Sequence, residues 1–107
     1  METTIRAGEE IATLINIFTV EPENQQELLS LLKDGTETSI SKMAGWISTS
    51  FLSGTDGRRV IVYSQWRSAK NVEAMRQNPN MGAYLQRVAA LATFEAILCV
   101  VTCVHHA

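Results

Sequence analysis

Four stretches of the chain are rich in apolar and β-branched residues, and in the second of them apolar and polar residues alternate. This pattern predicts strands whose side chains point alternately to the two faces of a sheet. The predicted strands cover residues 11–20, 46–53, 58–66 and 96–104. The second and third are joined by a segment that contains Asp56-Gly57, a dipeptide typical of tight hairpin turns.

Between the strands, apolar residues recur every three or four positions, as in helices with one buried face. The predicted helices cover about 22–42, 69–77 and 79–93. Pro22 and Pro79 suit the first turns of the first and third helices, and Ser68 suits the N-cap of the second.

The order of elements is therefore strand, helix, two strands, one or two helices, and a last strand. Two right-handed β-α-β crossovers that share a hairpin give an α+β, ferredoxin-like βαββαβ fold. Its four-stranded antiparallel sheet carries the helices on one face. We expect residues 1–10 to be an N-terminal extension and residues 11–107 to be a single domain.

The predicted strands are apolar on both faces. In the third strand, Val60 and Val62 point one way and Ile61 and Tyr63 the other, and the segment 96–104 is apolar almost throughout. Helices can cover only one face, and soluble monomers rarely expose so large an apolar patch. We therefore predict a homodimer that packs sheet to sheet, although a different partner would serve as well.

Composition excludes several classes of protein. Hydrophobic residues make up 46% of the 107 residues and the net charge is −2, so the basic face of a nucleic-acid-binding protein is missing. The longest apolar run, 96–101, is far shorter than the roughly 20 residues of a membrane span. We expect no interaction with a membrane and, since the first ten residues lack the apolar core of a signal peptide, a cytoplasmic protein.

The cysteines and histidines do not predict a metal site. Cys99 and Cys103 would lie about 13 Å apart in one strand, too far for a disulfide, which fits a reducing cytoplasm. His105 and His106 stand at the end of the chain, where two isolated imidazoles make a poor metal site.

Three segments carry a resemblance to a known family. They are LINIFTVEPENQQELLSLL, GWISTSFLSGTDGRRVIVYSQWRS and FEAILCVVTCV. The chain resembles the antibiotic-biosynthesis-monooxygenase domain from about Ala12 to Val104, most specifically at Tyr63–Ser68. The resemblance implies a dimeric ferredoxin-like fold. It also implies a small enzyme that oxidises a polyketide anthrone or related phenol with molecular oxygen, without metal or organic cofactor.

The chain departs from the residues that the resemblance implies for an active site. Anthrone-oxidising members have an Asn where this chain has Val62, a His where it has Leu52, and a Tyr where it has Val72. Trp66 matches, and Arg87 is a candidate match for an Arg of the last helix.

A haem-degrading branch of the same family is a poorer match. Asn16 agrees with that branch, but Met75 and Leu85 replace its Trp and its haem-ligating His. Without an axial imidazole, haem binding loses its main anchor. We therefore expect no cofactor.

We predict a mostly apolar pocket for a flat aromatic ligand on the helix-facing side of the sheet. Its candidate catalytic residues are Trp66 and Asn16. Its candidate substrate-binding residues are Ser48, Ser50, Leu52, Val62, Ser64, Val72, Tyr84 and Arg87. The alternatives are plain core packing for Trp66, a satisfied internal hydrogen bond for Asn16, and solvent exposure for Arg87.

The first functional hypothesis is a cofactor-independent monooxygenase that oxidises a small aromatic, anthrone- or quinol-like substrate. The predicted pocket contains no His, Asp or Glu as general base, and Glu95 is one candidate from outside it. The second hypothesis is a non-catalytic dimeric ligand-binding or accessory domain on the same fold. A lyase or isomerase is a third, because a dry pocket also suits enolisation.

Overall fold

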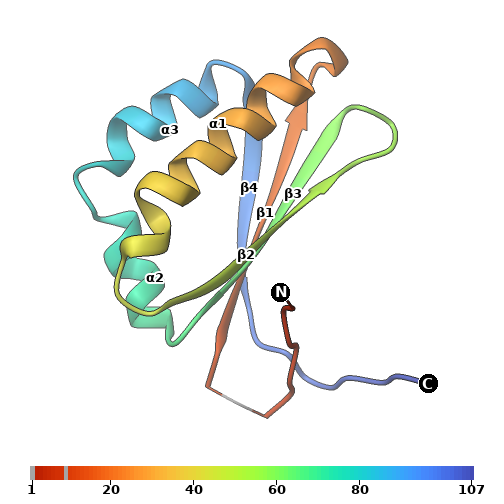
Figure 1. Ribbon diagram of the computed structural model, residues 1–107, viewed down its shortest axis with the longest axis vertical. Helices are drawn as coiled ribbons and strands as arrows, with labels where there is room; N and C mark the ends of the chain where they lie inside the picture. Colours follow the sequence, from red (N-terminus) through yellow and green to blue (C-terminus); the bar gives the residue numbers. More distant parts are fainter. Residues whose placement is uncertain (1, 9) are drawn as a thin grey trace.

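One antiparallel sheet with strand order β2-β3-β1-β4 forms one layer of the protein, and the helices form the other (Figure 1). The computed structural model describes residues 2–8 and 10–107. The elements are β1 (Ala12–Val20), α1 (Gln25–Thr38), β2 (Trp46–Ser53), β3 (Arg59–Trp66), α2 (Ala69–Arg76), α3 (Met81–Ala89) and β4 (Ala92–Cys99). Since α1, α2 and α3 all lie on one side of the sheet, the predicted ferredoxin-like arrangement is confirmed.

Two local sequence signals act as predicted. Gly57 adopts a positive φ of 76° in the β2–β3 turn, and the Asp56 carboxylate accepts a hydrogen bond from the Arg58 backbone N–H at 2.9 Å. Ser68 caps α2, because its hydroxyl accepts from the Asn71 backbone N–H at 3.3 Å.

The first helix is shorter than predicted. The segment 22–42 divides into a 3-10 turn at Pro22–Asn24, the α-helix α1, and a second 3-10 turn at Ile40–Lys42. The break falls at Ser39, whose φ of −132° lies outside the helical region. Just before it, the Thr38 hydroxyl donates to the backbone of the preceding turn, which competes with regular helix geometry.

The predicted fourth strand, 96–104, was placed four residues too late. The strand observed begins at Ala92, where it pairs with Val20, and ends at Cys99, where it pairs with Thr13. The sequence between Ala89 and Ala92 is rich in alanine and favours a helix, but pairing along the whole of β1 decides the outcome.

A β-bulge near the start of β2 changes which residues face the helices. Trp46 pairs with Trp66 and Ser48 with Gln65, so β2 advances two residues while β3 advances one. The extra residue is Ile47. Because side chains alternate with a period of two, one inserted residue moves every later side chain of β2 to the other face.

The predicted facing of β2 is therefore wrong from the bulge onward. Thr49 pairs with Ser64 and Phe51 with Val62, which turns these two β2 residues toward the helices. The residues that instead face away from the helices are Ser48, Ser50 and Leu52.

The core lies between the sheet and the helices in two clusters. The first contains Phe18, Val20, Leu28, Leu32, Val60, Val62 and Val88. The second contains Ala12, Leu14, Trp66, Val72, Met75 and Met81. Tyr84 packs against both clusters, so it lies where they meet.

The opposite face of the sheet is apolar and only partly covered. Ile15, Ile17, Ile61 and Tyr63 are half-buried there. Part of the predicted N-terminal extension, residues 2–8, covers one end of this face, where the Gln65 side chain donates to the Thr4 carbonyl at 2.8 Å. Met1 and Glu9 of that extension lie outside the described residues. No helix in the described part of the chain is long and apolar enough to cross a membrane.

Candidate active site

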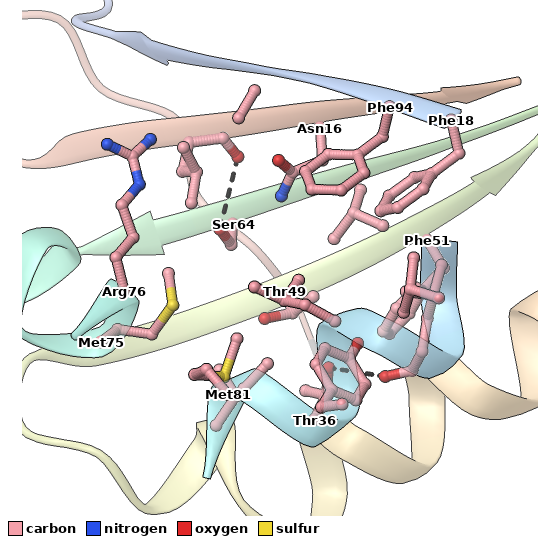
Figure 2. A pocket seen from close by; sticks show the side chains of 18 of the residues that line it. Asn16, Phe18, Thr36, Thr49, Phe51, Ser64, Met75, Arg76, Met81 and Phe94 are labelled. Atoms are coloured by element: carbon pink, nitrogen blue, oxygen red, sulfur yellow. Dashed lines mark hydrogen bonds between the residues drawn. The ribbon is translucent and has the colours of Figure 1, made fainter. Parts of the chain in front are cut away.

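A cavity of about 260 Å³ lies between the helices and the inner face of the sheet (Figure 2). Strands β1, β2, β3 and β4 form its floor, and α1, α2 and α3 form its roof. Leu85 of α3 and Phe94 of β4 line the cavity and are 36% and 43% exposed. The cavity is therefore open to solvent where these two elements meet.

The two ends of the cavity differ in chemistry. At one end Phe18 and Phe94 stack, with ring centroids 5.1 Å apart and an interplanar angle of 28°. At the other end lie Trp66, Met75 and Arg76. Paired strand positions place the two phenylalanines side by side, because Phe18 pairs with Phe94 across β1 and β4. A flat apolar molecule fits a space of this size and lining.

Several polar groups of the lining already have partners. The Trp66 indole N–H donates to the Ser64 hydroxyl at 3.1 Å, and that hydroxyl donates to the Leu14 carbonyl at 3.3 Å. The Thr36 hydroxyl donates to the Leu32 carbonyl at 2.9 Å. These bonds satisfy the buried groups from within the protein, so Trp66 is a wall of the cavity whose N–H is already engaged.

The Asn16 side chain, in contrast, has no hydrogen-bond partner among the described residues and projects into the middle of the cavity. It lies on β1, where it pairs with Val62 on one side and Ala96 on the other. Both neighbours are small and apolar, which leaves the amide open toward the cavity. An amide with two N–H donors in an apolar cavity can bind an oxygen atom of a ligand.

Thr49 offers a second polar group. Its hydroxyl oxygen accepts a hydrogen bond from the Trp46 indole N–H at 2.8 Å, and its own proton remains available. Trp46 therefore orients Thr49.

Tyr84 lies in the roof of the cavity as a neutral phenol. Burial raises its pKa to about 12, and the positive charge of Arg87 offsets part of that rise. Its ring packs directly on Gly35 of α1, in the space that a β-carbon at Gly35 would occupy. Gly35 therefore allows the close approach that sets the height of the roof.

Arg76 is the sole charged residue among those that line the cavity. It ends α2, and its guanidinium lies 3.7 Å from the Glu73 carboxylate of the preceding turn. Figure 2 shows its side chain across the end of the cavity opposite Phe18 and Phe94.

The structure brings half of the predicted site residues together. Those that line the cavity are Asn16, Val62, Ser64, Trp66 and Tyr84. Val72 is fully buried in the core beside Trp66 and does not reach the cavity. Arg87 is exposed on α3 and lies outside the lining, as do Ser48, Ser50 and Leu52. Glu95 points to the opposite face of the sheet, where it pairs with Ile17.

Most of the apolar lining lies outside the predicted set of site residues, and for four of the omitted residues the structure gives a specific reason. The bulge in β2 reverses the faces on which Thr49 and Phe51 were expected. Phe94 lies before the predicted start of the last strand, so no face of the sheet was predicted for it. Arg76 carries no distinguishing signal in the sequence, because the last turn of a helix is a common place for a basic residue. In the described part of the chain, no group of three or more His, Cys, Asp or Glu residues could hold a metal ion.

Comparison with known proteins agrees with this fold. The chain is 35% identical over 99 residues to tetracenomycin-F1 monooxygenase of Streptomyces glaucescens, covering 92% of this chain and 88% of that protein. Among solved structures, a variant of SnoaB, a cofactor-independent oxygenase from Streptomyces nogalater, has a TM-score of 0.79 at 18% identity. The match covers 86% of this chain and 93% of SnoaB.

A second similar structure contains a ligand. It is the ActVA-Orf6 monooxygenase of Streptomyces coelicolor in complex with nanaomycin D, with a TM-score of 0.78 at 22% identity. The match covers 90% of this chain and 91% of that one. At these identities the two structures show a shared fold. The sequence also matches the antibiotic biosynthesis monooxygenase family over residues 11–87, and with the 35% identical relative this shows that the chain belongs to that family.

Proposed function

We propose that the protein is a cofactor-independent monooxygenase that inserts one atom of molecular oxygen into a small phenolic or anthrone-like aromatic substrate. The observation that carries the proposal is the unpartnered Asn16 amide in the middle of an apolar cavity. The relationship to tetracenomycin-F1 monooxygenase supports the type of reaction.

The reaction requires little from the protein beyond binding and exclusion of water. A deprotonated, electron-rich substrate transfers one electron to oxygen, and the substrate radical and superoxide combine into a peroxide. The peroxide takes up a proton and loses water, which leaves a carbonyl on the ring. One oxygen atom enters the product and the other leaves as water with the two hydrogens of the oxidised carbon. The apolar walls around Phe18 and Phe94 would keep bulk water from the intermediates.

Asn16 would bind the oxygen of the ionised substrate. A buried amide donor stabilises such an anion more strongly than water-exposed groups do, because the surroundings have a low dielectric constant. The resemblance implies an Asn at the position of Val62, and Asn16 pairs directly with Val62 on the neighbouring strand. The chain would thus supply an amide from β1 in place of one from β3.

The neutral Tyr84 phenol would act as a second hydrogen-bond donor. Its pKa of about 12 keeps its proton in place at neutral pH. Within the part of the chain that the structure describes, no carboxylate or imidazole lines the cavity, so the substrate must lose its proton readily. This requirement favours phenols and anthrones whose anions form near neutral pH.

Oxygen consumption tests the proposal. Wild type, Asn16→Leu and Tyr84→Phe are compared with a panel of anthrones and naphthols, with Lys70→Gln on the exposed face of α2 as control. We expect Asn16→Leu to lower kcat by about 10²-fold, the cost of one anion-binding donor. Tyr84→Phe should cost less, and Lys70→Gln should match wild type. Uptake no faster than the spontaneous rate across the whole panel would reject the enzyme.

A second function is favoured by one observation, the lack of a general base among the residues that line the cavity. The chain would then be a dimeric ligand-binding or accessory domain. Native mass spectrometry that recovers a bound aromatic ligand, from a protein without oxygen uptake, would support this alternative.

We further infer that the protein is a homodimer that pairs through the outer face of the sheet. Ile15, Ile17 and Ile61 form an apolar surface there that residues 2–8 cover only at one end. An apolar surface of this kind favours contact with a second protein surface.

Sedimentation velocity tests the dimer. Wild type should sediment as a dimer at micromolar concentration and Ile61→Glu as a monomer, while Thr55→Glu in the exposed hairpin turn should leave the dimer intact. A monomeric wild type would contradict the inference.

We place the protein in the cytoplasm. Cys99 and Cys103 are both free, which fits a reducing compartment.

A further inference from the structure

We propose that Arg76 binds an anionic oxygen group of the substrate, best a carboxylate, at the end of the cavity opposite the stacked phenylalanines. The inference rests on the proposed function in assuming an aromatic ligand, and it adds that this ligand carries a negative charge at one end. Arg76 would be the residue that decides which end of the ligand enters the cavity first.

Arg76 gives the cavity a positive charge. The net charge of the protein is −2, and among residues 2–8 and 10–107 no charged side chain other than Arg76 lines the cavity. An anionic ligand therefore finds one compensating group. A guanidinium is planar and presents paired N–H donors that match the two oxygens of a carboxylate.

Arg76 is also placed where it can bind one end of a ligand. The Arg76 side chain is 42% exposed, so its charge stays hydrated and avoids the cost of full burial. Figure 2 shows it across one end of the cavity, with Asn16 between it and Phe94. A ligand that holds its anionic group at Arg76 would place its rings toward the phenylalanines and an intermediate ring atom beside Asn16.

The interaction of Arg76 with its partner Glu73 is weak. The nearest approach of Arg76 to Glu73 is 3.7 Å, and the Glu73 side chain is 59% exposed. Exposed pairs with this geometry contribute little, on the order of 0–1 kcal/mol. A ligand carboxylate can therefore displace Glu73 from Arg76, and Glu73 acts as a competitor for the site.

Binding of an already oxidised ligand tests the proposal without turnover. Anthraquinone-2-carboxylate and its methyl ester differ in charge and share the same rings. Their dissociation constants are measured by fluorescence quenching for wild type, Arg76→Gln, Glu73→Gln and the control Lys70→Gln, which removes an exposed charge from the same helix.

We expect wild type to bind the carboxylate about 10-fold tighter than the ester, the effect of one charge-assisted pair. Arg76→Gln should abolish this preference and leave the ester affinity within about two-fold of wild type. Glu73→Gln should tighten carboxylate binding, because it removes the competitor. Lys70→Gln should retain the preference. Added salt should weaken the preference, as expected for a partly exposed pair.

Three results would overturn the proposal. They are equal affinity of wild type for the two ligands, an equal loss of both affinities in Arg76→Gln, and the absence of binding of either ligand up to its solubility limit. The test is independent of oxygen uptake. A protein that shows the Arg76-dependent preference and consumes no oxygen would reject the monooxygenase and retain the anion site. Oxygen uptake that does not change with substrate charge or with Arg76→Gln would reject the anion site and retain the monooxygenase.

Discussion

Replacement of Gly35 by alanine should destabilise the protein, although alanine is the better helix former. Gly35 lies inside α1 and is buried under the ring of Tyr84. A β-carbon built on Gly35 would stand 2.9 Å from two carbons of that ring and closer still to a third. The ring cannot bend, so either Tyr84 or the axis of α1 must shift.

The magnitude follows from two opposing terms. Alanine in place of glycine within a helix contributes about 0.5–1 kcal/mol of stability. Overpacking of a buried contact costs about 1–3 kcal/mol. Gly35→Ala should therefore lower the free energy of unfolding by up to about 2.5 kcal/mol. In a Tyr84→Ala background the contact is gone, so the same change should raise that free energy by about 0.5–1 kcal/mol.

Urea denaturation of the four proteins of this double-mutant cycle measures the coupling, expected at about 1–3 kcal/mol. Gly82→Ala in α3 is the matched control, because a β-carbon there meets no atom within 4 Å. It should be neutral or slightly stabilising in both backgrounds. If Gly35→Ala stabilises wild type and Tyr84→Ala equally, Tyr84 does not pack on Gly35 and the roof of the cavity is built differently.

Three further outcomes are expected from single substitutions. Leu28 is 0% exposed in the larger core cluster, so Leu28→Ala should lower the free energy of unfolding by about 2–5 kcal/mol in urea denaturation. A loss below about 1 kcal/mol would contradict tight packing in that cluster. Ser68→Ala should cost about 1 kcal/mol by the same assay, and Ser68→Asp much less, since aspartate also caps the backbone N–H of Asn71. In the folded protein the pKa of Tyr84 is about 12, whereas in the unfolded chain it has its ordinary value of 10.0. Between these two values the unfolded chain loses the Tyr84 proton and the folded protein keeps it, so the free energy of unfolding should fall as pH rises from about 10 to about 12. Comparison of urea midpoints with Tyr84→Phe isolates this pH dependence, which is absent if the two proteins show the same profile.

Local signals in the sequence were sufficient for most of the fold. Runs of apolar and β-branched residues located β1, β2 and β3, and Asp56-Gly57 located the hairpin turn between β2 and β3. These features depend on neighbouring residues, so they can be read along the chain. The end of α3 and the start of β4 could not be read along the chain in this way. The alanine-rich segment near residue 90 favours a helix, while strand pairing with β1 requires extended backbone.

The site was harder to predict than the fold, because its lining depends on how strands pair and not only on neighbouring residues. Trp66, Ser64 and Val62 were placed on the correct face because β3 alternates without interruption. Thr49 and Phe51 were assigned to the wrong face because a bulge is a property of two paired strands. No periodicity within β2 marks the extra residue.

The sequence by itself determined the order of the elements, the two apolar faces of the sheet, and a mid-strand amide at Asn16 among apolar neighbours. These follow from the side-chain period of two in strands and from the composition of short segments. Only the tertiary structure decided that Asn16 lacks a partner, that Tyr84 closes the roof over Gly35, and that Arg76, not Arg87, reaches the cavity. Each of these depends on how a helix sits on the sheet. The packing of many distant side chains sets that position, and no local pattern in the chain records it.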